Sequence, residues 1–427
     1  MKERYSKNSR VANKEDRFIP IREVNNFYNP VDELELVQGS RKKRMPSDSI
    51  CSKRRNTFRY SKRKENRSIF SKEMCFNIES SKKGYKINKN PVKVIEAPGL
   101  LDDFYLNLLS WGRNNIVSVG LEESVFLFNF RNNEVINHLS LSSRKSADEI
   151  NSINDIDKYV CGTLFDELGD ILYTGDSIGN LYLSNVEKNK VVSSRSVHGS
   201  RIGSLDAHNN LLITGSRDKM IKLFDIRSSS LSPINCFSGH SQEICGIKLS
   251  SDSHYIASGG NDNKLILWDI RKMKQVAQLG DHEAAVKALA WNPNNKNILL
   301  SGAGTADRKI RIFDCNSLEQ INEIDTGSQV CNLAFDNSGP GIISTQGYSL
   351  NQLIVWIPND DYSEIYKEDL LIAHKLRVLY MSQSPCGKYI ATGAGDETIR
   401  IWGLENRQKK VETSSFYRKE QLSQMIR

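Results

Sequence analysis

The sequence predicts an all-β fold: a seven-bladed β-propeller with a basic arm before it and a short tail after it. Five segments contain a short apolar run that ends in an aromatic residue, and in the three clearest copies Asp218, Asp262 or Asp307 precedes the run. These aromatic residues are Phe224, Trp268, Phe313, Trp356 and Trp402, so the pattern recurs every 43 to 46 residues. A repeat of about 40–45 residues with four short strands is the signature of a propeller blade. No helical period runs through the repeats.

Two degenerate units lie upstream, with Phe128 and Ser184 at the position of the aromatic residue. They bring the number of units to seven. The interval of 56 residues between these two positions is longer than one blade. We therefore expect an inserted surface loop around residues 140–157.

One unit shows the expected order of strands. Residues 244–249 alternate in polarity, residues 255–258 are mostly apolar, and residues 265–268 end in Trp268. Ser, Asp, Gly and Asn separate these runs, as in turns between short strands. A ring of such units must also be closed. We expect residues 92–95 to add the outermost strand to the last blade, so that the propeller spans residues 92–404 without an open edge.

The arm, residues 1–91, differs from the body in charge. Residues 1–93 hold 25 Lys and Arg against 11 Asp and Glu, whereas the other 334 residues hold 34 against 40. The arm has no sustained apolar period, so we expect most of it to be disordered. The tail, residues 405–427, is expected to be flexible up to its last residues.

Two basic clusters, residues 41–44 and 53–64, leave three interpretations open. A nuclear-import signal is favoured over a solvated charged tail. A nucleic-acid patch comes third, because Phe58 and Tyr60 are too few for a stacking platform. A separate apolar island, residues 16–20, has the form of a short docking motif, since Pro20 favours an extended backbone before it.

Composition excludes several classes of protein. The eight cysteines form no CxxC pair and have no His at metal-ligand spacing, so we expect reduced thiols and no metal or other cofactor. No apolar run is long enough for a membrane span, and residues 1–20 lack the apolar core of a secretory signal. We expect a protein of the nucleus and cytoplasm with no membrane partner.

Recurring histidines and aspartates suggest a catalytic triad, but their repetition argues against one. His198, His240, His282 and His374 are each followed 20 to 25 residues later by an Asp, often with Ser or Thr between them. A catalytic triad is needed once, whereas this set recurs in four blades. We expect buried hydrogen-bond chains within the blades and no enzyme activity.

Residues 97–111, Ala-Pro-Gly-Leu-Leu-Asp-Asp-Phe-Tyr-Leu-Asn-Leu-Leu-Ser-Trp, resemble the fizzy/fizzy-related family of WD-repeat activators. Residues 16–20 resemble the family's C-box, and Ile426-Arg427 resembles its C-terminal Ile-Arg dipeptide. Residues 325–334, 347–349 and 393–398 are more similar to the fizzy-related branch than to the mitotic branch.

The resemblance implies a non-enzymatic activator and substrate adaptor of the anaphase-promoting complex, a ubiquitin ligase. Its partners would be subunits of that complex, degron-bearing substrates such as cyclins, and pseudosubstrate inhibitors. Docking on the ligase would use Asp16, Arg17, Phe18, Ile19, Pro20, Ile426 and Arg427. Two linked weak contacts act together through effective concentration.

The resemblance also implies two degron sites on the propeller. The Arg of a destruction box would be held by Asp103 and Glu397, at the seam of the first and last blades. A KEN-box peptide, which carries Lys-Glu-Asn, would bind Asn261, Asn263, Thr305, Gln352 and Arg377. Asp262 is expected to be structural. Ser110 replaces an Asp found in many relatives, and we expect this change to weaken Lys recognition.

One alternative from another class is a propeller scaffold of a nuclear RNA or chromatin assembly, with the basic arm bound to nucleic acid. The terminal motifs favour the adaptor, for which no specific nucleic acid is expected.

Overall fold

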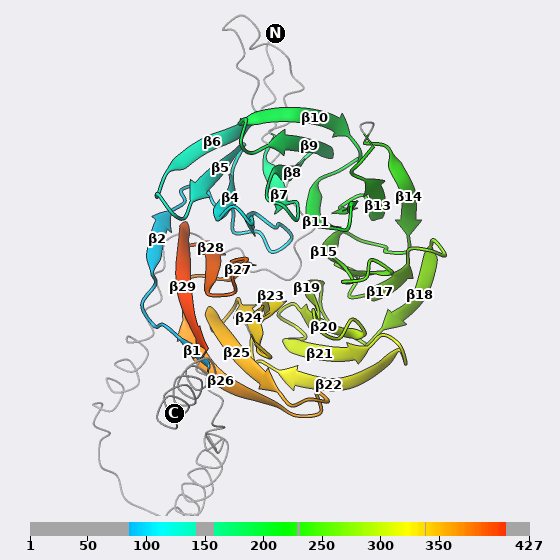
Figure 1. Cartoon of the computed structure of the whole chain (residues 1–427). Helices are drawn as coiled ribbons and strands as arrows, with labels where there is room; N and C mark the ends of the chain where they lie inside the picture. Colours follow the sequence, from blue (N-terminus) through cyan, green and yellow to red (C-terminus); the bar gives the residue numbers. More distant parts are fainter. Residues whose placement is uncertain (1–84, 142–157, 229–230, 338, 407–427) are drawn as a thin grey trace, which may run out of the picture. The chain divides into compact units, whose positions relative to one another are not determined.

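The structure is a computed structural model and describes residues 85–141, 158–228, 231–337 and 339–406. These residues form 29 strands in seven antiparallel sheets that follow one another around a ring (Figure 1). The innermost strands of all seven sheets line a central cavity. The predicted all-β, seven-bladed propeller is thus confirmed.

Six blades are four-stranded meanders in chain order. Blade one holds β3 (Leu109–Trp111), β4 (Ile116–Leu121), β5 (Ser124–Asn129) and β6 (Val135–Ser140). Blade two holds β7 (Val160–Phe165), β8 (Ile171–Asp176), β9 (Asn180–Asn185) and β10 (Lys190–Ser196). Blade three holds β11 (Ile202–His208), β12 (Leu211–Ser216), β13 (Met220–Asp225) and β14 (Pro233–Ser238).

Blade four holds β15 (Ile244–Leu249), β16 (Tyr255–Gly260), β17 (Leu265–Asp269) and β18 (Lys274–Leu279). Blade five holds β19 (Val286–Trp291), β20 (Ile298–Ala303), β21 (Lys309–Asp314) and β22 (Glu319–Asp325). Blade six holds β23 (Val330–Phe335), β24 (Ile342–Gln346), β25 (Gln352–Pro358) and β26 (Ile365–Ile372).

Blade seven joins the two ends of the propeller. Its own strands are β27 (Val378–Gln383), β28 (Tyr389–Ala394) and β29 (Thr398–Asn406), and the outer edge of β29 pairs with two strands from the start of the body. β2 (Lys93–Glu96) pairs with β29 at Thr398 to Ile401, where a closing strand was expected. β1 (Tyr85–Ile87) pairs farther along, at Leu404 to Asn406. The closure therefore begins upstream of the predicted boundary at residue 92, because the nine residues of β29 leave room for two short strands.

The seven repeat positions found in the sequence all lie on the third strand of a blade. In blade four, Trp268 donates from Nε1 to Ser258 Oγ at 2.8 Å, and His240 is hydrogen-bonded to both Ser258 and Asp262. Equivalent His–Ser/Thr–Asp chains run through blades three, five and seven. The prediction that these triads are structural is confirmed, and so is the structural role of Asp262.

The six cysteines within the described residues are free, whereas Cys51 and Cys75 lie outside them. Most of the predicted insertion around residues 140–157 also lies outside the described ranges. In the part of the chain that the structure describes, no helix is long and apolar enough to span a membrane.

Candidate functional site

The segment 97–107, which leads into β3, connects blades on different sides of the ring. It begins against blade seven, where Ala97 N donates to Glu397 O at 2.8 Å. The hydroxyl of Tyr380 on β27 then donates to Leu101 O at 2.6 Å. It ends against blade three, where Asn107 Nδ2 donates to Gly203 O at 2.8 Å. The side chains between these anchors form the candidate site.

Asp102 binds a buried arginine of blade seven. Arg377 is 2% exposed and precedes β27. Its Nε donates to Asp102 Oδ1 at 3.0 Å and its Nη2 donates to Asp102 O at 2.8 Å. Its guanidinium also lies 5.0 Å from the ring centroid of Tyr348. Among the described residues Nη1 has no hydrogen-bond partner, so one N–H edge of this guanidinium is unpaired there.

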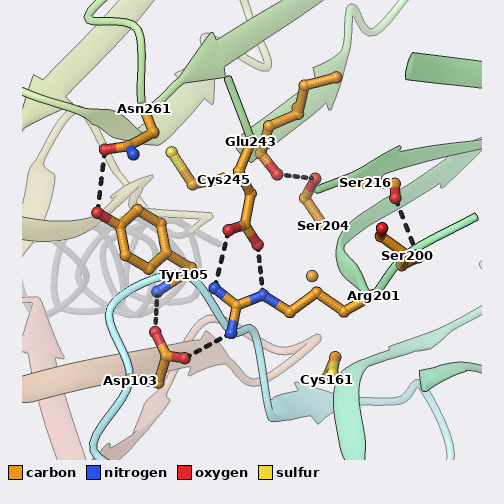
Figure 2. A network of polar contacts seen from close by, with 12 residues as sticks. Asp103, Tyr105, Cys161, Ser200, Arg201, Ser204, Ser216, Glu243, Cys245 and Asn261 are labelled. Atoms are coloured by element: carbon orange, nitrogen blue, oxygen red, sulfur yellow. Dashed lines mark hydrogen bonds and ion pairs between the residues drawn. The ribbon is translucent and has the colours of Figure 1, made fainter. Parts of the chain in front are cut away.

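Asp103 binds a second arginine, Arg201, which precedes β11 (Figure 2). Arg201 Nη1 lies 2.9 Å from Asp103 Oδ2, and the same guanidinium makes a bidentate pair with Glu243 at 2.6 and 2.8 Å. Burial raises the pKa of the Glu243 carboxyl, while Arg201 opposes that shift. One cation therefore neutralises two carboxylates from different parts of the chain, and the Asp103 side chain stays 30% exposed.

Tyr105 carries the network on to blade four, as Figure 2 shows. Its backbone N–H donates to Asp103 Oδ1 at 2.8 Å, which fixes the orientation of that carboxylate. Its hydroxyl donates to Asn261 Oδ1 at 3.0 Å. Asn261 is held in turn by its own backbone N–H, which donates to Glu243 O at 2.8 Å. A proposed destruction-box acid and a proposed KEN-box amide thus belong to one hydrogen-bonded network.

Three buried carboxamides lie on blade six. Gln352 is 5% exposed, and its Nε2 donates to Gln346 Oε1 at 2.7 Å. Gln346 Nε2 and Gln329 Oε1 are buried without partners among the described residues. Two further carboxamides with unpaired polar atoms therefore lie beside Gln352, whose role in KEN-box binding stays a prediction.

The residues predicted from the sequence did not include Gln329, Arg201 and Glu243. The repeat nevertheless contains a signal for these three positions. Each stands three residues after the His of its blade or its equivalent, and directly before the innermost strand, as Arg377 does. The four residues are thus equivalent positions of blades three, four, six and seven. Blade five has Ala285 there and blade two has Tyr159.

The remaining predicted residues lie on turns. Asn263, which is half-buried, and Glu397, which is exposed, occupy equivalent turns between the second and third strands of blades four and seven, and both have positive φ. Thr305 is exposed beside the corresponding turn of blade five. The structure shows no contact between the described side chains of Glu397 and Asp103, because Asp103 is turned toward Arg201.

Ser110 lies on β3, directly before Trp111. It lines the central cavity, and its Oγ accepts a hydrogen bond from Phe165 N at 3.1 Å. None of the five proposed KEN-box residues lines that cavity. The expected effect of Ser110 on Lys recognition stays a prediction. The motif at residues 16–20 and the pair Ile426 and Arg427 lie outside the described residues.

The family model for the CDC20/Fizzy WD40 domain matches residues 95–402, which include every blade and every proposed degron contact. The chain belongs to this family. The match begins within β2 and ends at Trp402 on β29, close to the two points where the ring is closed.

Individual relatives show which branch of the CDC20/Fizzy family this chain is most similar to. The chain is 40% identical over 321 residues to the B-type cell cycle switch protein ccs52B of Medicago truncatula, which covers 75% of this chain and 62% of the relative. It is 34% identical over 436 residues to the meiotic fizzy-related protein 1 of Schizosaccharomyces pombe, covering 93% and 99%. It is 36% identical to the anaphase-promoting complex subunit cdh1 of Dictyostelium discoideum, covering 79% and 47%. The fizzy-related branch is confirmed.

A solved structure of the Mitotic Checkpoint Complex contains a chain with the same fold, at a TM-score of 0.69 and 30% identity, covering 85% of this chain and 99% of that chain. Membership of the CDC20/Fizzy WD40 family confirms the prediction that this protein is not an enzyme. In the described ranges no group of three or more His, Cys, Asp or Glu is placed to hold a metal ion.

Proposed function

We propose that this protein is an activator and substrate adaptor of the anaphase-promoting complex, and that its propeller binds destruction-box and KEN-box peptides. Membership of the CDC20/Fizzy WD40 family supports the proposal, as does the relative whose name makes it a subunit of that complex. The likeness to a chain of a mitotic checkpoint assembly supports inhibitor complexes among its partners.

The observation that carries the proposal is a group of buried polar atoms without partners on one rim of the ring. Arg377 Nη1, Gln329 Oε1 and Gln346 Nε2 are all unpaired among the described residues. A Cβ on Gly347 would lie 2.4 Å from Gln329 Oε1, and Arg377 stacks on the adjacent Tyr348, so the three atoms surround one short segment. Buried polar groups in proteins are normally hydrogen-bonded. A ligand with a carboxylate and an amide would satisfy them.

A Lys-Glu-Asn peptide offers that chemistry. Its Glu carboxylate suits the unpaired Nη1 of Arg377, and its Asn carboxamide suits Gln329 or Gln346. Its Lys ammonium needs acceptor oxygens, which Asn261, Asn263 and Thr305 present on neighbouring turns. The peptide would thus lie across blades four to seven.

The destruction-box site would use carboxylates on the two sides of the seam between blades one and seven. Asp103 is half-buried with its orientation fixed by Tyr105, and Glu397 is exposed on the β28–β29 turn. An incoming Arg can share Asp103 with Arg201, because a carboxylate has two oxygens and about four acceptor positions. Glu397 would approach the same guanidinium from the other side.

Docking on the ligase would use residues 16–20 together with Ile426 and Arg427. We also propose that the protein acts in the nucleus and the cytoplasm. We propose these contacts from their likeness to the family's terminal motifs. Two weak anchors on one chain bind cooperatively through effective concentration, so loss of either should cost far more than its small contact area suggests.

The proposal is tested by fluorescence polarisation with labelled KEN-box and destruction-box peptides. Arg377→Ala should remove KEN-box binding and spare the other peptide, whereas Asp103→Asn should do the reverse. Arg271→Ala is the matched control, since the Arg271 side chain is 60% exposed and, among the residues that the structure describes, its one ion pair is with Asp269. Ligase pull-down with a chain lacking residues 426–427 tests docking. If neither peptide binds the intact chain, and nucleic acid binds with a steep salt dependence, the scaffold alternative replaces the adaptor.

A further inference from the structure

Six of the seven blades share a local irregularity on the innermost strand. In blades two to seven the pairing of the first with the second strand shifts register across one residue, as in a β-bulge. A bulge leaves that residue outside the ladder and re-aims its side chain. The residue within each shift is Cys161, Gly203, Cys245, Lys287, Cys331 or Leu379. Five of these six are small or apolar, and the sixth is a lysine.

Lys287 crosses the inside of the ring from blade five. It is 4% exposed, and its Nζ donates to Leu106 O at 2.9 Å and to Leu379 O at 3.2 Å. Leu106 belongs to the segment before blade one, and Leu379 lies on β27 of blade seven. The ammonium also lies 5.4 Å from the ring centroid of Phe104 and 5.3 Å from that of Tyr380. One side chain thus holds both sides of the seam where the ring closes.

Lys287 and Tyr380 together fix the backbone of the segment that carries the candidate site. Tyr380 OH shares its one proton between Leu101 O, at 2.6 Å, and Asp103 O, at 3.2 Å, and Lys287 donates to the buried carbonyl of Leu106. The side chains of the same segment reach Arg377, Arg201 and Asn261. Lys287 and Tyr380, which both line the central cavity, therefore anchor the segment through its carbonyl groups. The side chains of the segment position residues of both degron sites.

We infer that Lys287 is a positioning residue shared by the two degron sites: its ammonium holds the segment 101–106 in the geometry that both peptides require. The inference rests on the proposed function. Lys287 touches neither proposed peptide site, so its effect would pass through Asp102, Asp103 and Tyr105. Its loss should weaken both peptides together, whereas loss of a direct contact should weaken one.

The protonation state of Lys287 supplies a readout that a purely structural lysine would not give. Burial lowers the pKa of Lys287 to about 8. The groups that face it are Cys245 on β15, Cys331 on β23 and Tyr380 on β27, and the charges of Asp103 and Arg377 act on it separately. Burial raises the pKa of the Cys331 thiol to about 12, and raises those of Cys245 and Tyr380 as well.

The ammonium of Lys287 is therefore present below pH 8 and lost above it, while these thiols and the phenol stay protonated. A neutral amine makes weaker hydrogen bonds to carbonyls and loses its attraction to the two aromatic rings. Peptide affinity should accordingly be constant below pH 7 and fall as the pH rises through 8.

The test measures the affinity of both peptides, with capped termini, for the full chain between pH 6.5 and 9.5. In the unmodified protein both affinities should fall together above pH 8. Lys287→Met should lower both about tenfold at pH 7 and make both independent of pH. Lys248→Met is the matched control, because Lys248 lines the same cavity but pairs with Asp206 and contacts no part of the segment.

Three outcomes would overturn the inference while leaving the proposed function intact. In the first, both affinities of the unmodified protein stay constant to pH 9.5. In the second, Lys287→Met binds both peptides normally, and in the third, Lys287→Met weakens one peptide alone. If Lys287→Met does not fold, as judged by circular dichroism, the pH profile of the unmodified protein still decides. Tyr380→Phe, which removes the hydroxyl alone, is the second variant and should also weaken both peptides. Failure of either peptide to bind at any pH contradicts the proposed function instead.

Discussion

The hydroxyl of Tyr105 donates a hydrogen bond to Asn261 Oδ1 at 3.0 Å, although the two residues lie 156 positions apart in the chain. Tyr105 is two residues from the proposed destruction-box acid Asp103, and Asn261 belongs to the proposed KEN-box site. The bond fixes which carboxamide atom of Asn261 faces Tyr105 and leaves Nδ2 to Gln242 Oε1, at 2.8 Å.

Replacement of Tyr105 by Phe removes this bond without changing the volume of the side chain. We expect KEN-box affinity to fall by about three- to tenfold, because one hydrogen bond contributes about 1 kcal/mol. Destruction-box affinity should change less, since the backbone N–H of Tyr105 still holds Asp103. The measurement is fluorescence polarisation with both peptides. Tyr255→Phe is the control, and equal losses for both variants would contradict the prediction.

Replacement of Arg201 by Met should destabilise the propeller. It leaves the Glu243 carboxylate buried without its bidentate partner, a change that costs about 3 kcal/mol in comparable buried pairs. Burial raises the pKa of Glu243, so loss of Arg201 should raise it further. Since protonation removes the buried charge, the stability deficit of the variant should shrink as the pH falls from 7 to 5. Denaturant unfolding at both pH values measures this.

The double variant Arg201→Met/Glu243→Leu provides the control for that experiment. It removes both charges, so it should recover much of the lost stability at pH 7. A deficit in the single variant that does not change between pH 7 and pH 5 would show that an unpaired Glu243 is not its cause.

The His–Ser/Thr–Asp chains should contribute to stability in a pH-dependent way. Contacts with His198 and with the N–H groups of Gly199 and Met220 outweigh burial and lower the pKa of Asp218 to about 2. A carboxyl whose pKa is lower in the folded state stabilises the fold above its unfolded pKa of about 4. That contribution is lost as the pH falls from 4 to 2.

Asp218→Asn should therefore lower the unfolding free energy by about 2 kcal/mol at pH 7 and by little at pH 2. Thermal unfolding from pH 7 down to pH 2 checks this. A deficit that persists undiminished at the lowest pH would mean that the ionised carboxylate is not the source of the stability.

Closure of the ring should depend on β2 more than on β1. A chain that starts at residue 89 loses β1 and with it Ile87, which is 1% exposed and packs with Trp402 and Leu371. Burial of one such side chain contributes about 2 kcal/mol. A chain that starts at residue 98 loses both strands and exposes the whole edge of β29, so we expect aggregation as well as a lower melting temperature. Calorimetry and light scattering of the two truncated chains compare these effects.

The arm contains the tripeptide Lys64-Glu65-Asn66, which has the sequence of a KEN box. A synthetic peptide of residues 58–72 should therefore bind the propeller and compete with a labelled KEN-box peptide. Asn66→Ala in that peptide should abolish the competition, and so should Arg377→Ala in the protein. Competition that survives both changes would show that the basic residues of the peptide bind the acidic body without recognition of the motif.

The fold was predictable from the sequence because a propeller repeats its local rules seven times. An aromatic residue on six of the third strands and a His and an Asp in four blades recur at nearly constant spacing, so even Ser184 in a degenerate copy could be placed correctly. The closing strand was predictable because the residues before blade one alternate in polarity. The three residues of β1 were too short a run to indicate a strand.

The candidate site could be predicted only in outline. The resemblance named positions such as Asp103, Asn261 and Arg377, but not their partners, because those partners come from blades that are distant in the chain. The pairing of Asp103 with Arg201, the commitment of Gln352 to Gln346, and the position of Lys287 beneath the segment 101–106 all depend on how the ring brings its inner strands together. Periodicity is a local property of the chain and determined the blades. The contacts across the ring are not local, so only the tertiary structure decided them.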